Sequence, residues 1–373
     1  MFQLLDHVDT IRKEVGRQIS QERKAELGQF MTPTTVARFM AALFAPSTLQ
    51  TARLLDAGAG IGSLSGAFLN LWASGSFDFQ RLELTVYEID AHLREHLART
   101  LSEYQAGADV DVSMLPGDFI EDAVRLIREG TPRFTHAILN PPYKKINSAS
   151  RHRLLLRQVG IETVNLYSAF VALAIELMQP GGQIVAIIPR SFCNGPYYRP
   201  FRDLIFTKTA IKHLHLFGAR DRAFRDDDVL QENVIILLER AAPQSDVTVS
   251  TSMDGDFTDT ETHLHPFNRI VFPDDPERFI HVPTSAEHDE KELAPVANTS
   301  LVDIGLQVST GPVVDFRVRA HVRQMPEPGS VPLLYAHHFS GPAIDWPQAG
   351  IKKPNAIMRN NETEKWLYPN GYY

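Results

Sequence analysis

Apolar, strand-like segments alternate with helix-like segments from about residue 52 to residue 240. This alternation restricts the fold more than any other feature, because two parallel strands need a crossover between them, and that crossover is usually a helix. It predicts a doubly wound α/β domain, in which ligands bind beyond the carboxyl ends of the strands. The residues that directly follow each predicted strand are therefore the candidates for a functional site.

One of these apolar strands ends in the tetrapeptide Asn140-Pro141-Pro142-Tyr143. The prolines stop the strand and leave Asn140 at its carboxyl end. The side-chain oxygen of Asn140 and the carbonyl of Pro141 can each accept a hydrogen bond from an amine. Tyr143 offers a flat face for a planar base.

Two acceptors of this kind suit a poorly nucleophilic amine, such as the exocyclic amine of adenine. By holding both N–H bonds out of the ring plane, they would localise the nitrogen lone pair and stabilise the positive charge that develops on it. A neutral amide is too weak a base to act by abstracting a proton. Asn-Pro is also an ordinary strand-ending turn, and the four residues alone leave both interpretations open.

A glycine-rich turn follows the first predicted strand of the domain, in the order Asp56-Ala57-Gly58-Ala59-Gly60. Glycines let the backbone approach a ligand closely, and the amino end of the next helix favours a negative group. Many nucleotide-binding proteins share such a turn. The glycine spacing of the dinucleotide fingerprint is missing and an acid heads the turn, so a nicotinamide cofactor is disfavoured.

Acidic residues follow the next two predicted strands. Glu88, near the end of the strand predicted over 84–90, can accept hydrogen bonds from both ribose hydroxyls of an adenosyl group. Asp118 can accept one from an adenine amine, while Phe119 flanks the ring. Asp118 equally fits the N-cap of the following helix, and both interpretations remain open.

The amino-terminal region contributes a predicted helical arm and a loop. Apolar residues at helical spacing predict a helix from about residue 3 to residue 26, packed on the main domain. Thr32 and Pro33 then begin a second helix. The loop that contains Phe30 and Thr32 is predicted to lie over a bound cofactor, and a simple N-cap is the alternative.

Composition is that of an ordinary globular protein, with 373 residues that suggest about two domains. The single cysteine, Cys193, excludes an internal disulfide framework, favours a reducing compartment and is predicted to be a passive loop residue. Without an apolar run long enough to span a membrane, and with a polar amino terminus, we expect a cytoplasmic protein. Clustered metal ligands are not evident, so we expect no metal.

The formal net charge of -8 is concentrated near the carboxyl end. Residues 242–373 hold 10 Lys and Arg against 18 Asp and Glu, whereas residues 1–241 balance at 27 against 27. Overall charge therefore does not argue for a nucleic-acid partner, although basic residues in the last segment could form a local basic surface.

The sequence pattern changes after residue 241, where short polar strands and proline-containing turns replace long helices. We therefore expect three parts: a helical arm over residues 1–27, the α/β domain over 28–241, and a mixed, mainly β domain over 242–373. The last residues read as a hairpin entering a strand, so we expect this last domain to be incomplete.

Together these segments resemble the N6-adenine DNA methyltransferases of bacterial restriction-modification systems, in the class whose cofactor motifs precede the catalytic motif and whose target-recognition domain is carboxy-terminal. The resemblance covers about residues 28–240 and rests on the combination and order of the motifs. It implies a Rossmann-like, seven-stranded sheet whose final strand is antiparallel. It also implies S-adenosyl-L-methionine as the cofactor and site-specific adenine methylation of double-stranded DNA as the activity.

The resemblance assigns roles to the residues of the matching motifs. Asn140, Pro141, Pro142 and Tyr143 correspond to the catalytic tetrapeptide, with Tyr143 stacking on a flipped-out base. The implied cofactor-binding residues are Phe30, Thr32, Asp56, Gly58, Gly60, Glu88, Asp118 and Phe119.

The resemblance also points to residues that contact DNA. Phe224 lies where the family places a second stacking aromatic residue. Arg317, Arg319 and Lys352 are the candidates for base readout, and Arg317 and Arg319 would share a face if their segment is a strand. A cognate restriction endonuclease is the implied partner, while the recognition sequence and the oligomeric state are not indicated.

Other functions remain as alternatives. A protein glutamine methyltransferase shares the tetrapeptide, but the region after residue 241 argues for DNA. An RNA adenine methyltransferase is a second alternative, and a non-enzymatic DNA-binding specificity or scaffold subunit is a third. Cytosine-N4 transfer usually has Ser or Asp at the first position of the tetrapeptide, and cytosine-C5 transfer needs a cysteine nucleophile, whereas Cys193 lies outside any such motif.

Overall fold

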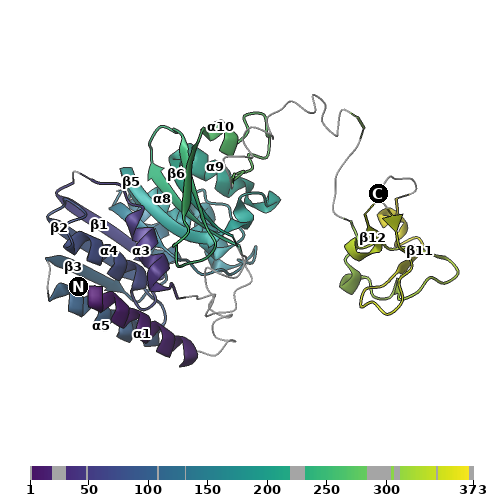
Figure 1. The fold of residues 1–373 in the computed structure, drawn as a ribbon, viewed down its shortest axis with the longest axis horizontal. Helices are drawn as coiled ribbons and strands as arrows, with labels where there is room; N and C mark the ends of the chain where they lie inside the picture. The colour runs from purple at the N-terminus through teal and green to yellow at the C-terminus, as the bar shows by residue number, and fades with distance from the viewer. Residues whose placement is uncertain are drawn as a thin grey trace. The chain divides into compact units, whose positions relative to one another are not determined.

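The computed structural model divides the chain into two compact units, Met1–Ala294 (unit 1) and Pro295–Tyr373 (unit 2) (Figure 1). None of the helices in the ranges that the structure describes is long and apolar enough to cross a membrane. The described residues are 2–18, 31–47, 49–106, 109–130, 132–218, 232–283, 304–305, 311–341 and 343–368.

Unit 1 is built around a sheet that has nine strands among its described residues, in the order β3-β2-β1-β4-β5-β7-β6-β8-β9. β1 pairs in parallel with β2 and β4, β2 pairs in parallel with β3, and β4 with β5. β7 runs antiparallel between β5 and β6. The strands are β1 Thr51–Ala57, β2 Arg81–Tyr87, β3 Val110–Leu115, β4 Phe134–Leu139, β5 Met178–Pro189, β6 Thr209–Phe217, β7 Asn233–Arg240, β8 Val247–Ser252 and β9 Glu261–His265.

Helices cover both faces of this sheet (Figure 1). Successive strand residues alternate between the faces: Ala137 and Leu139 join the core under α6 and α8, whereas Ile138 joins the core under α3, α4 and α5. The expected α/β architecture, with a large and mostly parallel sheet, is confirmed. The helices are α1 Phe2–Gln18, α3 Thr34–Ala42, α4 Ser63–Ala73, α5 Ala91–Gln105, α6 Phe119–Glu129, α7 Arg151–Gln158, α8 Leu166–Leu177, α9 Arg199–Lys208, α10 Phe267–Ile270, and the short 3-10 helices Arg190–Phe192 and Pro196–Tyr198.

The amino-terminal arm is the helix α1, described over Phe2–Gln18; the rest of the predicted helix, to about residue 26, lies outside the described residues. Val8 and Val15 are buried in a small cluster with Ile61 and Leu93. The arm therefore packs on the α/β core through the apolar stripe that the sequence predicted.

The sheet continues past residue 241, where we expected a second domain to begin. β8 pairs in parallel with β6, and β9 pairs antiparallel with β8. Val247 and Val249 of β8 are buried in the same core as β4 and β5. The described sheet therefore has nine strands rather than seven, and the chain divides near residue 294 rather than 241. The pattern misled because a short alternating strand does not reveal which sheet it joins.

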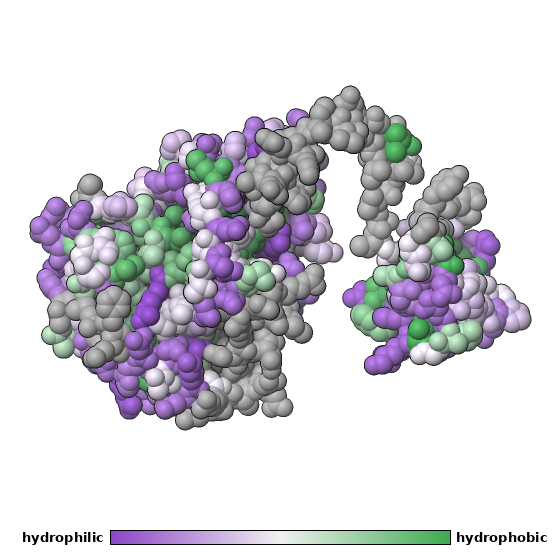
Figure 2. All heavy atoms as spheres, viewed as in Figure 1, coloured by the Kyte–Doolittle hydropathy of each residue, from purple (hydrophilic) through white to green (hydrophobic). Residues whose placement is uncertain are grey.

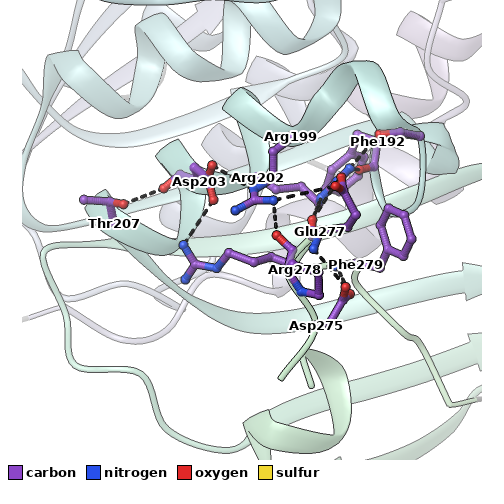
Figure 3. Close-up of polar contacts among 11 residues, drawn as sticks. Phe192, Arg199, Arg202, Asp203, Thr207, Asp275, Glu277, Arg278 and Phe279 are labelled. Atoms are coloured by element: carbon purple, nitrogen blue, oxygen red, sulfur yellow. Dashed lines mark hydrogen bonds and ion pairs between the residues drawn. The ribbon is translucent and has the colours of Figure 1, made fainter. Parts of the chain in front are cut away.

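A buried arginine fixes the segment after β9 to helix α9 (Figure 3). Arg202 is fully buried and donates hydrogen bonds to the carbonyls of Phe192 (2.9 Å), Gly195 (2.8 Å) and Glu277 (2.8 Å). Asp275 accepts a hydrogen bond from the backbone N–H of Glu277 at 2.9 Å and so holds the turn that presents this carbonyl. A guanidinium suits the position because its planar fork can serve several acceptors at once.

We predict that Arg202→Lys lowers the free energy of unfolding of unit 1 by about 3 kcal/mol. The lysine ammonium keeps the buried charge but cannot reach the three carbonyls together. Urea unfolding followed by far-ultraviolet circular dichroism, which reports mainly the helices of unit 1, measures the change.

The matched control is Arg199→Lys on the same helix. Arg199 is partly exposed, pairs with Asp203 at 3.0 Å and also contacts the carbonyl of Pro276. A change below about 1 kcal/mol is expected for an exposed ion pair. Equal losses in the two variants would contradict a special role for the buried arginine.

Unit 2 has short strands around a buried polar residue. Nδ2 of Asn355 donates to the carbonyls of Gln324 (2.7 Å) and Gln348 (2.8 Å), and its Oδ1 accepts from Nε2 of His338 (3.0 Å). These bonds tie together loops that bury little apolar surface. The described elements are a three-stranded sheet of β10 Val322–Arg323, β14 Ala356–Met358 and β11 Ser330–Pro332, a hairpin of β12 Phe339–Ser340 and β13 Ala343–Ile344, and 3-10 helices at Asp315–Arg317, Ala336–His338 and Glu364–Trp366.

The surface of unit 1 carries hydrophobic as well as hydrophilic residues. On the face drawn in Figure 2, hydrophilic residues surround a central band of hydrophobic ones. Some large apolar side chains of the described residues remain exposed, among them Ile89 at the end of β2 (57%) and Tyr197 after β5 (77%). Both follow strand ends, where open α/β sheets bind their ligands.

A histidine is buried between β6 and β8. His215 has no exposed surface, and its Nδ1 and Nε2 lie 2.8 Å and 3.1 Å from the hydroxyls of Ser250 and Ser252. The ring of Phe39 on α3 covers it at 4.6 Å. Burial, together with the nearby His213, lowers the pKa of His215 to about 3.

We predict that unit 1 loses stability as the pH falls below 6.5, the ordinary histidine value. Between pH 6.5 and about 3 the unfolded chain binds a proton at His215 that the folded chain does not, which costs about 1.4 kcal/mol per pH unit. Urea unfolding measures the free energy of unfolding at about pH 7.5 and about pH 5.5. The difference between the two values should be smaller for His215→Gln than for the wild type. An identical difference would contradict the assignment.

Candidate functional site

A cavity of about 220 Å³ lies where β1, β2, β3 and β4 end. The carboxyl ends of parallel strands meet at one edge of the sheet, so residues distant in sequence come together there. Asp56, Pro141 and Tyr143 lie outside the lining, and Phe30 and Phe224 lie outside the described residues. The lining contains the predicted site residues Thr32, Gly58, Gly60, Glu88, Asp118, Phe119, Asn140 and Pro142.

The glycine turn after β1 is bound to the end of β2. The backbone N–H groups of Gly58 and Ala59 both donate to the carbonyl of Tyr87 at 2.9 Å. The N–H of Gly60 donates to Oε2 of Glu88 at 2.8 Å. These hydrogen bonds fix the turn, and its backbone forms part of the cavity wall.

Glu88 is held in place by backbone groups on both of its oxygens. Oε2 accepts from Gly60, and Oε1 accepts from the N–H of Asp90 at 2.8 Å. Only 2% of the residue is exposed, and this burial raises the pKa of its carboxyl group above the usual value. Each carboxylate oxygen can accept more than one hydrogen bond, so a fixed Glu88 can still serve a ligand in the cavity.

Asp56 lies behind the glycine turn. Its Oδ2 accepts from the hydroxyl of Ser65 at 2.6 Å and from the Ser65 N–H at 3.2 Å. Its Oδ1 has no hydrogen-bond partner among the described residues, and burial raises the pKa of Asp56 to about 7. Asp56 thus joins β1 to the first turn of α4 rather than lining the cavity.

The side-chain amide of Asn140 is oriented from both ends. Its Nδ2 donates to Oγ1 of Thr32 at 3.0 Å, and its Oδ1 accepts from the hydroxyl of Tyr143 at 3.3 Å. Thr32 was predicted to contact a cofactor, and it lines the cavity, but its hydroxyl also holds the Asn140 amide. The amide is therefore preorganised before any ligand binds.

Tyr143 is half-buried rather than freely exposed. Its single hydroxyl proton is shared between Oδ1 of Asn140 and the carbonyl of Ile187, which lies 3.2 Å from the hydroxyl oxygen. Its ring packs edge-on against Tyr167 with 6.2 Å between ring centroids. These contacts hold the aromatic plane rigidly beside Asn140.

Asp118 caps α6 and also binds a histidine. Its Oδ1 accepts from the N–H groups of Ile120 (2.8 Å) and Glu121 (3.3 Å), which is the N-cap that the sequence allowed. Its Oδ2 lies 2.8 Å from Nε2 of His152 on α7. Burial opposes ionisation of Asp118, but His152 and the two amides outweigh it and lower the pKa of Asp118. The hydrogen bond that His152 donates to Asp118 in turn raises the pKa of His152.

The cavity lining also contains residues that sequence reasoning missed. His152 lies in a basic stretch after the tetrapeptide, where repeated arginines gave no reason to single out one histidine. The apolar members belong to strand ends and to α8, and their residue types look like ordinary core. The missed lining residues include Tyr87, Ile89, His152, Leu166 and Phe170.

The lone cysteine is remote from this chemistry. Cys193 is buried, and burial raises the pKa of its thiol to about 12. A neutral thiol is a poor nucleophile, which agrees with the passive role predicted for it.

Arg317, Arg319 and Lys352 are exposed side chains of unit 2. The segment Asp315–Arg317 is a 3-10 helix rather than a strand, so the strand geometry that we expected for Arg317 and Arg319 is wrong. The sequence misled here because its alternation of apolar and basic residues imitates a strand.

Comparisons with known proteins identify the class. Residues 68–224 match the family described as Eco57I restriction-modification methylase. A cryoEM structure of a DrdV-DNA complex matches with a TM-score of 0.53 at 15% identity, over 78% of this chain and 35% of that one. A structure of a type I restriction-modification system matches with a TM-score of 0.52 at 16% identity, over 77% and 55%. At such identities the structures show a shared fold alone, and the family model covers less than half of the chain.

Two curated relatives define the family within that class. The type II methyltransferase M.BsuBI of Bacillus subtilis is 50% identical over 380 residues, covering 100% of this chain and 75% of that protein. The type II methyltransferase M.PstI of Providencia stuartii is 40% identical over 379 residues, covering 98% and 73%. The chain belongs to the type II methyltransferases. This confirms the restriction-modification methyltransferase that the motif order predicted.

We predict that Gly62→Ala destabilises unit 1 by about 2 kcal/mol more than Gly75→Ala. Both glycines have positive φ, at 90° and 80°. A Cβ at Gly62, the N-cap of α4, would lie 2.9 Å from Cδ1 of Leu97, whereas a Cβ at Gly75 would meet none of the described atoms within 4 Å. Comparing the two variants by urea unfolding separates the cost of the contact with Leu97 from the cost of a positive φ. Equal losses in the free energy of unfolding would contradict the prediction.

Proposed function

We propose that this chain is the modification component of a restriction-modification system, a site-specific DNA methyltransferase that transfers a methyl group from S-adenosyl-L-methionine to N6 of adenine. The observation that carries the proposal is that Asn140 and Pro142 line the same cavity as the glycine turn, Glu88 and Asp118. Methyl transfer to an amine requires donor and acceptor in one enclosed space, at reacting distance.

The residues around the cavity fit an adenosyl cofactor. Glu88 would hold the ribose hydroxyls with its two fixed acceptor oxygens, and Asp118 would accept from the adenine amine. Phe119 offers apolar contact to the ring, and the start of α4 offers backbone N–H groups to a carboxylate. When bound, S-adenosyl-L-methionine supplies a sulfonium methyl group that is open to attack by a nucleophile.

Asn140 would act as the acceptor that activates the target amine. With Thr32 at the Nδ2 end of the amide, Oδ1 would be the acceptor for the incoming amine, beside the Tyr143 hydroxyl. With the carbonyl of Pro141 as a second acceptor, both N–H bonds of the amine are held, and positive charge on the nitrogen is stabilised as the new carbon–nitrogen bond forms. The proton is then lost to water, since neither acceptor is a base.

The target adenine would leave the duplex to reach this site. Tyr143, held by Ile187 and Tyr167, would provide the flat surface on which the flipped base stacks. We further propose that Phe224 supplies the opposite surface, that Arg317, Arg319 and Lys352 contact DNA, and that a cognate restriction endonuclease shares the recognition site.

Asn140→Ala is expected to reduce methyl transfer by at least about 100-fold while leaving cofactor affinity nearly unchanged, because it removes an acceptor for the target amine and no contact to the adenosyl group. Labelled methyl groups transferred to bacterial DNA measure the rate, and equilibrium dialysis measures cofactor binding. Mass spectrometry of the nucleosides identifies the methylated base.

The matched control is Asn147→Ala, which removes an exposed amide from the loop that follows the tetrapeptide. Its transfer rate should equal that of the wild type. N6-methyladenine in DNA is the expected product. If the product is N4-methylcytosine, or if the label is found only in RNA or in protein glutamine, the proposed substrate is wrong. Undiminished transfer by Asn140→Ala would refute the proposed chemistry.

A further inference from the structure

The contact between Asp118 and His152 joins two parts of the cavity wall that are distant in sequence. Asp118 begins α6 after β3, and His152 lies in the first turn of α7, which follows the loop from the tetrapeptide. Both residues line the cavity, and their side chains are only partly exposed, at 25% and 34%. The pair is therefore neither a solvated surface contact nor a buried core contact.

The hydrogen bonds of Asp118 leave little freedom for its carboxylate. Oδ1 accepts from two backbone N–H groups of α6, which use both of its lone pairs. Oδ2 accepts from Nε2 of His152, which leaves one lone pair on that oxygen. A ligand amine in the cavity can therefore bind Asp118 well only through Oδ2, next to the imidazole.

We propose that His152 is a positioning residue that fixes Oδ2 of Asp118 as the acceptor for the exocyclic amine of the cofactor's adenine ring. This inference rests on the proposed S-adenosyl-L-methionine site. His152 would not contact the adenine amine itself, because its Nε2 is committed to Asp118. By holding the carboxylate in place before the ligand arrives, His152 would reduce the conformational entropy that is lost on binding.

The surrounding charges favour an ion pair between the two residues. Asp118 and Glu121 of α6 face the imidazole with negative charge, while Arg151 of its own helix opposes its protonation. Lys144 also lines the cavity. Since the net effect raises the pKa of His152, the clamp is strongest below that pKa and weakens as the imidazole loses its charge at higher pH.

The test compares two ligands on four proteins by calorimetry, with no turnover required. The ligands are S-adenosylhomocysteine and its analogue with hydrogen in place of the 6-amino group. The proteins are the wild type, His152→Ala, His152→Gln and Arg151→Gln. Glutamine can place a donor where Nε2 of the histidine lies, and Arg151 joins the same two helices through Glu121 at 2.9 Å without lining the cavity.

His152→Ala is expected to weaken binding of S-adenosylhomocysteine about tenfold and to leave the amine-free analogue within about twofold. His152→Gln should restore most of the affinity, and Arg151→Gln should weaken the binding of neither ligand. From about pH 6 to about pH 9 the wild-type affinity should fall, whereas that of His152→Gln should stay level.

Equal weakening of both ligands by His152→Ala would overturn the proposal, because a positioning role acts only through the amine. An unchanged affinity of His152→Ala for S-adenosylhomocysteine would overturn it too. So would a loss of affinity in Arg151→Gln that matches the loss in His152→Ala, because both residues would then only hold α7 in place. If the wild type binds neither ligand, the proposed cofactor site fails and this inference fails with it. If the wild type binds S-adenosylhomocysteine but each variant affects both ligands equally, the proposed cofactor site stands and only the inference about His152 fails.

Discussion

The parallel pairing of β1 with β2 and β4 is the constraint on which the rest of the site depends. Its register places Ala57 beside Tyr87 and Leu55 beside Ala137, so the three strands end together. The glycine turn, Glu88 and Asn140 therefore lie together at one edge of the sheet, although they are far apart in the sequence. A change of one residue in this register would turn each strand's side chains to the opposite face and separate the groups.

Around that edge, several groups serve both the fold and the site. Asp118 caps a helix with one oxygen and presents the other to His152, and Glu88 binds the glycine turn while it lines the cavity. Thr32 holds the Asn140 amide from a segment more distant in the chain. Contacts of this kind couple the geometry of the cavity wall to that of the tetrapeptide at Asn140, because neither can move without breaking a contact that shapes the other.

Much of the site could be predicted from strand ends and turn chemistry, because the residues concerned directly follow apolar strands. The glycine turn, Glu88, Asp118 and Asn140 were found in this way, and all but the first two residues of the turn line one cavity. His152 and Phe170 were not found, because their place in the cavity depends on how α7 and α8 pack on the sheet. The domain boundary was misplaced for the same reason: β8 carries no local sign that it pairs with β6.

The sequence by itself determined the α/β architecture and the order of the motifs, because hydrophobic periodicity and turn residues act locally along the chain. The restriction-modification methyltransferase followed from the resemblance of that motif order to a known family. Only the tertiary structure decided which atoms face each other. It turned Asp56 away from the cavity, gave Asn140 its orientation through Thr32, and joined Asp118 to His152. These outcomes depend on distances between segments far apart in the chain, which no local pattern encodes.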